Sequence, residues 1–253
     1  MCRKIENILI TGASSGIGEA LALYYAEHGA VHMFLCGRNA KRLQDVQKRC
    51  QVHGADVQTQ IVDVTDQKAM EKWIKDCHKK AKLNLVIANA GVSTGAETSE
   101  NVYNTFETNV MGSLNTIMPA IELFKKRQDK DKIIAITSSI AGYHGLSACP
   151  SYSATKACLK AYGEGLRNHL KPYKIQVNVI CPGFVKSRIT DKNTCPMPFF
   201  MPADKAAKII AARIKHNCGL IAFPWPMRLA TWLLSVLPNR LSDFIYAILP
   251  HKV

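Results

Sequence analysis

Two side chains that can move a proton stand four positions apart in the segment YSATK. Tyr152 and Lys156 are expected to share one face of a helix over residues 150–171, since residues four apart are neighbours on a helix surface. A free tyrosine has a pKa of about 10, too high for efficient proton transfer at neutral pH. A nearby ammonium favours the phenolate, so we expect the pKa of Tyr152 to be lowered. Taken alone, the pair also suits an ordinary contact on a helix surface.

A glycine-rich stretch, ITGASSGIG, covers residues 10–18 directly after a short apolar run. Each glycine costs about 0.5–1 kcal/mol relative to alanine, so the stretch indicates that something approaches the backbone closely. Backbone N–H groups and the dipole at the start of a helix can receive a pyrophosphate. The stretch therefore predicts a dinucleotide site. Its spacing is TGxxxGxG, with Gly12, Gly16 and Gly18, rather than GxGxxG.

The elements that must position these groups alternate along the chain. Strands are predicted over residues 7–11, 31–36, 56–62, 83–88, 132–137, 174–180 and 220–223, and helices over 16–28, 39–52, 67–80, 100–127, 150–171 and 203–216. Strands that are apolar throughout are typical of a parallel sheet covered on both faces. The pattern predicts an α/β fold with a doubly wound, seven-stranded parallel sheet. One domain over residues 1–253 is expected, with ligands beyond the carboxyl ends of the strands.

Three motifs, in order and spacing, resemble the short-chain dehydrogenase/reductase family. They are TGASSGIG at 11–18, ANAG at 88–91 and YSATK at 152–156. The resemblance covers about residues 5–223 and implies a Rossmann-like fold with oxidoreductase activity. It implies that Tyr152 is the proton donor or acceptor. It also implies that Lys156 holds the ribose hydroxyls and, with an oxidised nicotinamide, favours the phenolate.

Two further catalytic residues follow from the resemblance. The family serine lies thirteen residues before the tyrosine, which selects Ser139 over its neighbour Ser138 as the group that orients the substrate oxygen. Asn109, in the segment TNVMG, matches the family asparagine, which holds a water molecule that links the lysine to solvent. Without the resemblance, Asn109 would be an ordinary polar residue in a helix.

The resemblance also assigns the residues that contact the cofactor. Asp63 and Val64 match the pair beside the adenine, and Pro182 and Gly183 match the turn beside the carboxamide. A threonine usually follows that turn, where this sequence has Ser187. The full predicted set is Gly12, Ser14, Ser15, Gly16, Ile17, Gly18, Arg38, Asp63, Val64, Asn89, Ala90, Gly91, Tyr152, Lys156, Pro182, Gly183, Val185 and Ser187.

The end of the second predicted strand bears on the choice of cofactor. It reads LCGRN, with Arg38 and no carboxylate. An acidic residue there would bind the ribose 2′-hydroxyl, whereas the planar fork of arginine suits a phosphate. The sequence therefore predicts NADP(H) over NAD(H), and an arginine that only faces solvent is the alternative. One feature departs from the pattern: a basic residue often occupies the glycine loop of NADP-binding members, where this chain has Ser14 and Ser15.

Charge and cysteine usage narrow the partners. With 33 basic and 19 acidic residues, the formal net charge is +14, which attracts phosphates, anionic substrates or an anionic membrane surface. The basic residues are spread out and no nucleic-acid motif accompanies them, so no nucleic-acid partner is expected. The nine cysteines show no CxxC pair or metal spacing, which predicts free thiols and no metal site. The N-terminal segment lacks signal-peptide features, which predicts a cytoplasmic protein.

The last part of the chain, residues 224–253, is an apolar helical tail with helices expected over 227–237 and 239–249. Each is shorter than the roughly 20 residues that span a bilayer. The tail would serve as a substrate lid, as a subunit interface or as an interfacial contact with a membrane surface. The sequence does not distinguish these three hypotheses.

The segment 186–216 is the part that varies most among family members and covers the substrate. Met197, Phe199, Phe200 and Met201 suggest the wall of an apolar pocket, although they would also suit packing of a short helix. The resemblance further suggests a homodimer or homotetramer. Gly163 and Gly165 would permit close helix contact between subunits or within one chain.

Two functions from different classes fit the sequence. The first is NADPH-dependent reduction of a carbonyl, or the reverse oxidation of an alcohol, on a small and apolar or lipid-like substrate. The second is a dinucleotide-binding sensor or scaffold without turnover, peripheral to a membrane. Loss of the tyrosine or the lysine would mark the second, and both are present.

Overall fold

Short runs of Ile, Val and Leu form seven strands that pair in parallel in the order β3-β2-β1-β4-β5-β6-β7. The computed structural model describes residues 5–192, 196–238 and 240–241. The strands are β1 (Asn7–Thr11), β2 (His32–Gly37), β3 (Asp56–Ile61), β4 (Leu85–Ala88), β5 (Ile133–Thr137), β6 (Gln176–Pro182) and β7 (Leu220–Phe223). The predicted α/β fold with one seven-stranded parallel sheet is confirmed.

The central strands β1, β4 and β5 are buried on both faces, which explains why they contain few polar residues. In β1, Ile8 and Ile10 belong to one hydrophobic core and Leu9 belongs to the other. Successive side chains of a strand point to opposite faces, so a strand between two helical layers must be apolar at every position.

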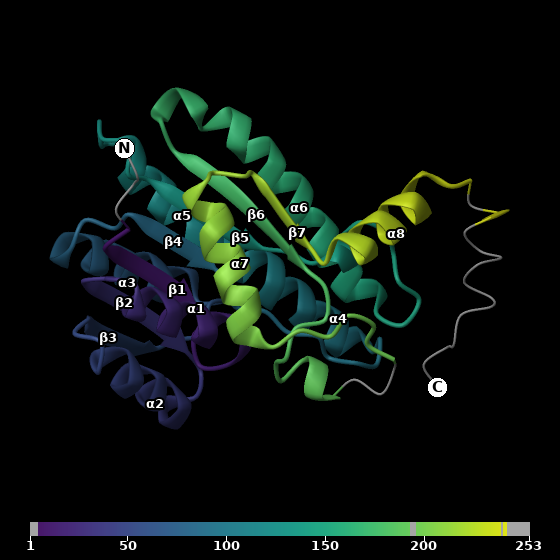
Figure 1. Ribbon diagram of the computed structural model, residues 1–253, viewed down its shortest axis with the longest axis horizontal. Helices are drawn as coiled ribbons and strands as arrows, with labels where there is room; N and C mark the ends of the chain where they lie inside the picture. The colour runs from purple at the N-terminus through teal and green to yellow at the C-terminus, as the bar shows by residue number, and fades with distance from the viewer. Residues whose placement is uncertain (1–4, 193–195, 239, 242–253) are drawn as a thin grey trace.

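The helices form two layers, one on each face (Figure 1). Residues of α1, α2 and α7 pack into one core, and residues of α3, α5 and α6 pack into the other. The helices are α1 (Gly16–Glu27), α2 (Ala40–Gln51), α3 (Gln67–Lys80), α4 (Ser99–Phe106), α5 (Gly112–Lys125), α6 (Pro150–His169), α7 (Ala203–Lys215) and α8 (Trp225–Val236).

The single helix predicted over residues 100–127 is wrong in detail. The chain forms α4, then a π-helical segment at Glu107–Met111, then α5. The π-helical segment contains Asn109, whose side chain is engaged outside the helix. Such segments interrupt α-helices frequently at functional sites, and the 3.6-residue hydrophobic pattern used for the prediction does not reveal them.

The strand order reverses between β1 and β4. From β1 the chain adds β2 and β3 on one side, and then crosses to β4 on the other side. In doubly wound sheets a ligand site lies at this reversal, beyond the carboxyl ends of the strands. The glycine-rich stretch follows β1, and the segment ANAG follows or ends β4, so both of these sequence motifs meet there.

Gly163 on α6 serves packing within the chain. A Cβ atom at this position would collide with the Val179 side chain and lie 3.3 Å from the Cδ1 atom of Ile136. At Gly165 a Cβ atom would meet no atom within 4 Å. The close approach that Gly163 allows is therefore between α6 and the sheet, and the predicted homodimer or homotetramer stays a prediction.

The tail begins with α8, two residues earlier than predicted, and no residue of this helix is buried. The second expected helix, 239–249, falls almost wholly outside the described residues. Within the described part of the chain, no helix has the length and apolar character needed to cross a membrane.

Candidate active site

The three glycines after β1 hold a turn that other side chains would not allow. Gly12 and Gly16 have φ angles of +66° and +58°, which L-residues rarely adopt. A Cβ atom at Gly12 would lie 2.8 Å from the Cα atom of Ala90, and one at Gly18 would collide with the Gly12 carbonyl oxygen. The turn is therefore packed tightly against the segment that ends β4.

This turn leads into α1 and leaves its first N–H groups facing a cavity. Ser15 is the N-cap residue, yet its side chain makes no capping hydrogen bond. Backbone N–H groups at a helix N-terminus, together with the helix dipole, form a site for a phosphate group. The fit to a pyrophosphate rests on this uncapped helix start and on the glycines that clear space before it.

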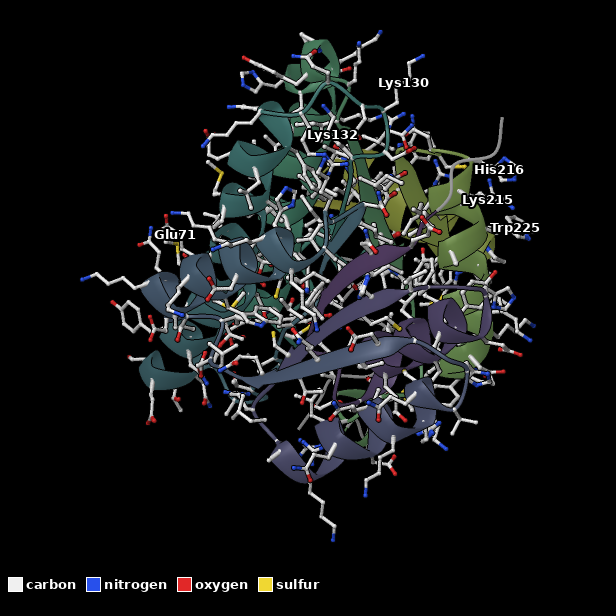
Figure 2. All side chains as sticks on the ribbon, turned by 90° about the vertical axis from the view of Figure 1, so that its left-hand side faces the viewer. Glu71, Lys130, Lys132, Lys215, His216 and Trp225 are labelled. Atoms are coloured by element: carbon white, nitrogen blue, oxygen red, sulfur yellow. The ribbon has the colours of Figure 1, made fainter. Side chains whose placement is uncertain are left out.

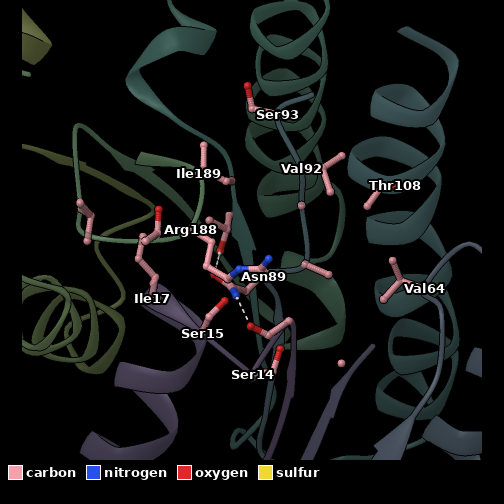
Figure 3. Close-up of a pocket in the computed structure, with 18 of the residues that line it drawn as sticks. Ser14, Ser15, Ile17, Val64, Asn89, Val92, Ser93, Thr108, Arg188 and Ile189 are labelled. Carbon is pink, nitrogen blue, oxygen red and sulfur yellow. Dashed lines mark hydrogen bonds between the residues drawn. The ribbon is translucent and has the colours of Figure 1, made fainter. Parts of the chain in front are cut away.

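A cavity of about 380 Å³ runs along the carboxyl ends of the strands from this turn to α6. Figure 3 shows Ser15 and Ile17 at one side of it and Val64 and Thr108 at the other. Of the predicted site residues, the cavity is lined by Gly12, Ser14, Ser15, Gly16, Ile17, Arg38, Asp63, Val64, Asn89, Ala90, Gly91, Ser139, Tyr152, Lys156, Pro182, Gly183, Val185 and Ser187. Gly18 and Asn109 do not line it.

Tyr152 and Lys156 line the cavity from the same face of α6. The Lys156 ammonium lies 5.5 Å from the centroid of the Tyr152 ring. It donates a hydrogen bond of 3.0 Å to the Thr137 carbonyl oxygen at the end of β5. Lys156 is thus fixed between the sheet and the phenol. It is only 4% exposed, so its ammonium group is a buried positive charge at the cavity wall.

The two serines that follow β5 do different things. The Ser138 hydroxyl donates to the Lys156 carbonyl oxygen at 2.6 Å and so ties β5 to α6. The Ser139 hydroxyl accepts from the Ala141 N–H at 3.1 Å, and its interaction with Tyr152 acts to lower the pKa of that phenol. Ser139 is therefore the one of the two serines that affects the phenol, and its role in orienting a substrate oxygen stays a prediction.

Asn109 is completely buried and holds three segments together. Its Oδ1 atom accepts from the Val92 N–H at 2.7 Å, and its Nδ2 atom donates to the Val92 carbonyl and the Thr155 hydroxyl, each at 3.0 Å. A Cβ atom at Gly91 would lie 3.1 Å from Oδ1 and 3.4 Å from the Lys156 nitrogen. Asn109 thus joins the loop after β4 to the helix that carries the lysine.

Burial sets the protonation of the pair in the protein by itself. Burial raises the pKa of Tyr152 to about 12, against the opposing effect of the Ser139 hydroxyl. Burial lowers the pKa of Lys156 from 10.5 to about 8. The expected lowering of the phenol pKa included the positive charge of an oxidised nicotinamide and stays a prediction, whereas in the protein by itself desolvation shifts the pKa upward. The phenol is therefore protonated at neutral pH.

At the end of the cavity beside β2 and β3, Arg38 faces an acidic residue. Its guanidinium lies 3.8 Å from the carboxylate of Asp63, and both side chains are substantially exposed. Asp63 is also bonded by Thr65, whose N–H and hydroxyl donate to it at 3.0 and 2.9 Å. Arg38 therefore lies at the mouth of the cavity, and its contact with Asp63 leaves most of the guanidinium exposed.

The sequence reasoning missed Arg42, which lines the same end of the cavity. Its Nε atom is buried and has no hydrogen-bond partner among the described residues. Its backbone N–H donates to the Asn39 side chain, which caps α2. The sequence position of Arg42 could have indicated it. A cation in the first turn of a helix is disfavoured by the helix dipole, so its presence there suggests that it binds an anion. The remaining lining residues that were not predicted are Gly37, Asn39, Val62, Val92, Ser93, Thr108, Thr137, Ser138, Arg188, Ile189 and Thr190.

Of the two interpretations of the Met and Phe residues in segment 186–216, the pocket wall is not observed. None of Met197, Phe199, Phe200 and Met201 lines this cavity. Met201 pairs with Val185 and packs against a hydrophobic core, and the two phenylalanines are exposed. Ile189 and Val92 line the cavity as apolar residues instead (Figure 3).

The chain resembles known proteins over most of its length. The family model described as short chain dehydrogenase matches residues 6–196. An uncharacterized oxidoreductase of Myxococcus xanthus is 37% identical over 240 residues, covering 93% of this chain and 94% of the relative.

Solved structures share the fold. A short-chain dehydrogenase from Sphingobium yanoikuyae in complex with NADPH superposes with a TM-score of 0.80 at 22% identity, covering 98% of both chains. One from Mycobacterium paratuberculosis bound to NAD superposes with a TM-score of 0.77 at 21% identity, covering 90% of this chain and 100% of the other. The chain belongs to the short-chain dehydrogenase family of oxidoreductases.

Proposed function

We propose that the protein is an NADPH-dependent oxidoreductase that reduces the carbonyl group of a small apolar molecule and catalyses the reverse alcohol oxidation. The observation that carries this proposal is the convergence of Tyr152, Ser139 and Lys156 on one cavity with the glycine turn. A proton donor, a hydroxyl for the substrate oxygen and a phosphate-binding turn then share a single space.

The cytoplasm is the proposed location.

Each side chain has a distinct task in the proposed reaction. The Ser139 hydroxyl donates to the substrate oxygen and turns it toward Tyr152. The Tyr152 phenol, protonated because burial raises its pKa to about 12, gives its proton to that oxygen as negative charge develops there. Lys156 holds positive charge beside the phenol and stabilises the phenolate left behind. The dinucleotide, when bound, supplies the hydride for reduction or accepts it for oxidation.

The glycine turn and the residues around it would hold the dinucleotide. Gly12, Gly16 and the start of α1 would bind the pyrophosphate, and Asp63 with Val64 would lie beside the adenine. Pro182, Gly183 and Ser187 would lie beside the carboxamide, and Lys156 would bind the ribose hydroxyls. Two family members of the same fold, solved with NADPH and with NAD, support a nicotinamide dinucleotide without distinguishing the two.

The preference for NADPH rests on the adenine end. Arg38 and Arg42 line it, and the end of β2 provides no carboxylate that would repel a 2′-phosphate. The buried Nε atom of Arg42 without a partner among the described residues is a hydrogen-bond donor that a phosphate oxygen would satisfy. Asp63 reduces this preference, because its carboxylate lies within 3.8 Å of Arg38.

The test is a parallel fluorescence titration with NADPH and NADH, followed by NADPH consumption with a panel of apolar aldehydes and ketones. We expect tighter NADPH binding, which Arg38→Asp reverses by about tenfold or more in affinity ratio. Tyr152→Phe should bind NADPH normally and lose turnover. Preference for NADH would overturn the cofactor assignment, and unchanged turnover in Tyr152→Phe would overturn the role of the phenol.

The competing function is a dinucleotide-binding sensor or scaffold without turnover. The buried, hydrogen-bonded Lys156 beside the Tyr152 ring favours the enzyme, since a sensor does not require a cation and a phenol together at the cavity wall. Tight NADPH binding without turnover of any carbonyl in the panel would support the sensor.

A further inference from the structure

One face of α8 is apolar and is left uncovered by the residues that the structure describes. We call it the α8 apolar face, and it consists of Trp225, Leu229, Trp232, Leu233 and Val236. Their exposed fractions are 73%, 46%, 49%, 46% and 57%. A surface helix usually turns its apolar stripe toward the core. A contiguous apolar surface that stays exposed indicates an interaction site.

The helix geometry directs this face away from the protein. At about 100° per residue, the five positions fall within an arc of about 100°. The half-buried residues Met227, Thr231 and Leu234 lie on the opposite side of the helix. Met227 packs against the body, since a Cβ atom at Gly183 would lie 3.2 Å from its sulfur. The helix is therefore attached by one side and presents the other to its surroundings.

The pictures show the same arrangement. In Figure 1, α8 projects beyond β7 at the edge of the sheet, away from the layered helices. In Figure 2, Trp225 lies at the periphery of the molecule. The base of α8 is next to Gly183, which lines the candidate active-site cavity. Whatever binds the α8 apolar face is thereby held close to the active-site end of the sheet.

Charge favours an anionic surface over a second copy of the chain as the partner of the α8 apolar face. The chain carries a formal net charge of +14, and α8 contains Arg228 and no acidic residue. Arg228 is exposed beside the apolar arc. A second copy would bring the same positive charge and the same arginine, and this like charge works against pairing of the two faces. An anionic surface would be attracted by both.

The residue types also suit a lipid boundary. Tryptophan is enriched where a bilayer meets water, because its ring is apolar and its N–H group is polar. Two of the chain's three tryptophans lie on this one face. A helix of twelve residues with an apolar face lies along the interface rather than across the bilayer.

We propose that the α8 apolar face docks the protein on the surface of an anionic lipid bilayer. The face enters the boundary between headgroups and acyl chains, and Arg228 pairs with lipid phosphates at its edge. This inference concerns attachment and does not depend on the proposed reaction. It places the mouth of the candidate active site near a phase in which apolar carbonyl compounds concentrate.

The test is flotation of the full-length protein with vesicles of phosphatidylcholine alone and of phosphatidylcholine mixed in equal parts with phosphatidylglycerol. We expect flotation with the anionic vesicles, reduced by high salt, and a blue shift of tryptophan emission on binding. The double variant Leu229→Glu/Trp232→Glu should lower the partition coefficient by about tenfold or more. Its NADPH titration and thermal unfolding should match the unmodified protein, because both residues are exposed.

The matched control is Val52→Glu/Val31→Glu, which changes the charge equally at exposed valines outside α8. It should keep vesicle binding within about twofold. Equal loss of binding in both double variants would overturn the proposal, because net charge alone would then explain attachment. Absence of flotation, or flotation that the α8 variant leaves unchanged, would overturn it too. So would a dimer in light scattering that only the α8 variant dissociates, since a second copy would then cover the face.

Discussion

The carboxylate of Glu97 accepts hydrogen bonds from both the N–H group and the hydroxyl of Ser151, at 3.1 and 2.8 Å. Ser151 is in the first turn of α6 and immediately precedes Tyr152. The N-cap residue of α6, Cys149, makes no side-chain capping bond. A residue 54 positions away therefore caps the helix that carries the proposed proton donor. The loop that holds Glu97 also carries Val92, which Asn109 fixes.

We expect Glu97 to position Tyr152, so that Glu97→Ala lowers kcat for carbonyl reduction several-fold with little change in cofactor affinity. The lost cap costs about 1 kcal/mol of helix stability, and the first turn of α6 moves with it. Glu97→Gln retains an acceptor oxygen and should recover most of the rate. Steady-state kinetics with both variants measures this. An equal loss in Glu100→Ala, at an exposed position in the first turn of α4, would contradict it.

The two serines after β5 should separate activity from stability. Ser139→Ala removes the donor to the substrate oxygen and should lower kcat/KM by about 10²–10³. Ser138→Ala removes the bond to the Lys156 carbonyl and should cost about 1–2 kcal/mol of unfolding free energy, with kcat/KM retained within several-fold. Kinetics and denaturant unfolding of both variants give the comparison. The reverse pattern would assign the catalytic role to Ser138.

The pH profile of carbonyl reduction should reflect Lys156. A lysine carries its charge below its pKa, which burial lowers to about 8 in the free protein. We therefore expect kcat/KM to be level at neutral pH and to fall as the pH rises through about 8. Tyr152, with a pKa of about 12, stays protonated over this range and adds no decline.

The control for this profile is Lys156→Arg, in which the charge persists at every pH measured. Any residual activity of that variant should show no decline near pH 8. A profile of the unmodified protein that stays level to pH 10 would show that the lysine does not titrate there.

Lys132 should stabilise the fold without contributing to the site. Its side chain is completely buried, and its ammonium donates to the carbonyl oxygens of Phe124, Arg127 and Tyr173 at 3.2, 2.6 and 2.7 Å. Lys132→Met leaves these carbonyls without their donor and should cost about 3 kcal/mol of unfolding free energy. Figure 2 shows Lys130 reaching outward while Lys132 lies inside.

The matched variant Lys130→Met, at an exposed position, should change the unfolding free energy by less than about 0.5 kcal/mol. Denaturant unfolding monitored by circular dichroism measures both, and NADPH affinity should be the same in both. A Lys132→Met protein as stable as the unmodified one would show that the three carbonyls find other partners.

The parallel sheet, the cavity beyond its strands and the residues that line the centre of that cavity follow from local features of the sequence. Strands that are apolar at every position require helices on both faces, and the glycine-rich stretch after β1 requires a close backbone approach. Tyr152 and Lys156 fall on one helix face because their spacing is local. Features that depend only on the spacing of nearby residues or on the composition of one strand can be predicted from the sequence, because folding does not change either.

Contacts between residues far apart in the chain could not be predicted from the sequence and are seen only in the folded protein. The cap that Glu97 provides for α6, the clamp of Asn109 on Val92 and the Arg38–Asp63 pair join segments that no sequence period relates. The pKa of Tyr152 rises in the protein by itself because desolvation depends on how much protein surrounds the phenol. The outward direction of the α8 apolar face was likewise hidden, since the helix is apolar on both sides and only packing shows which one is covered.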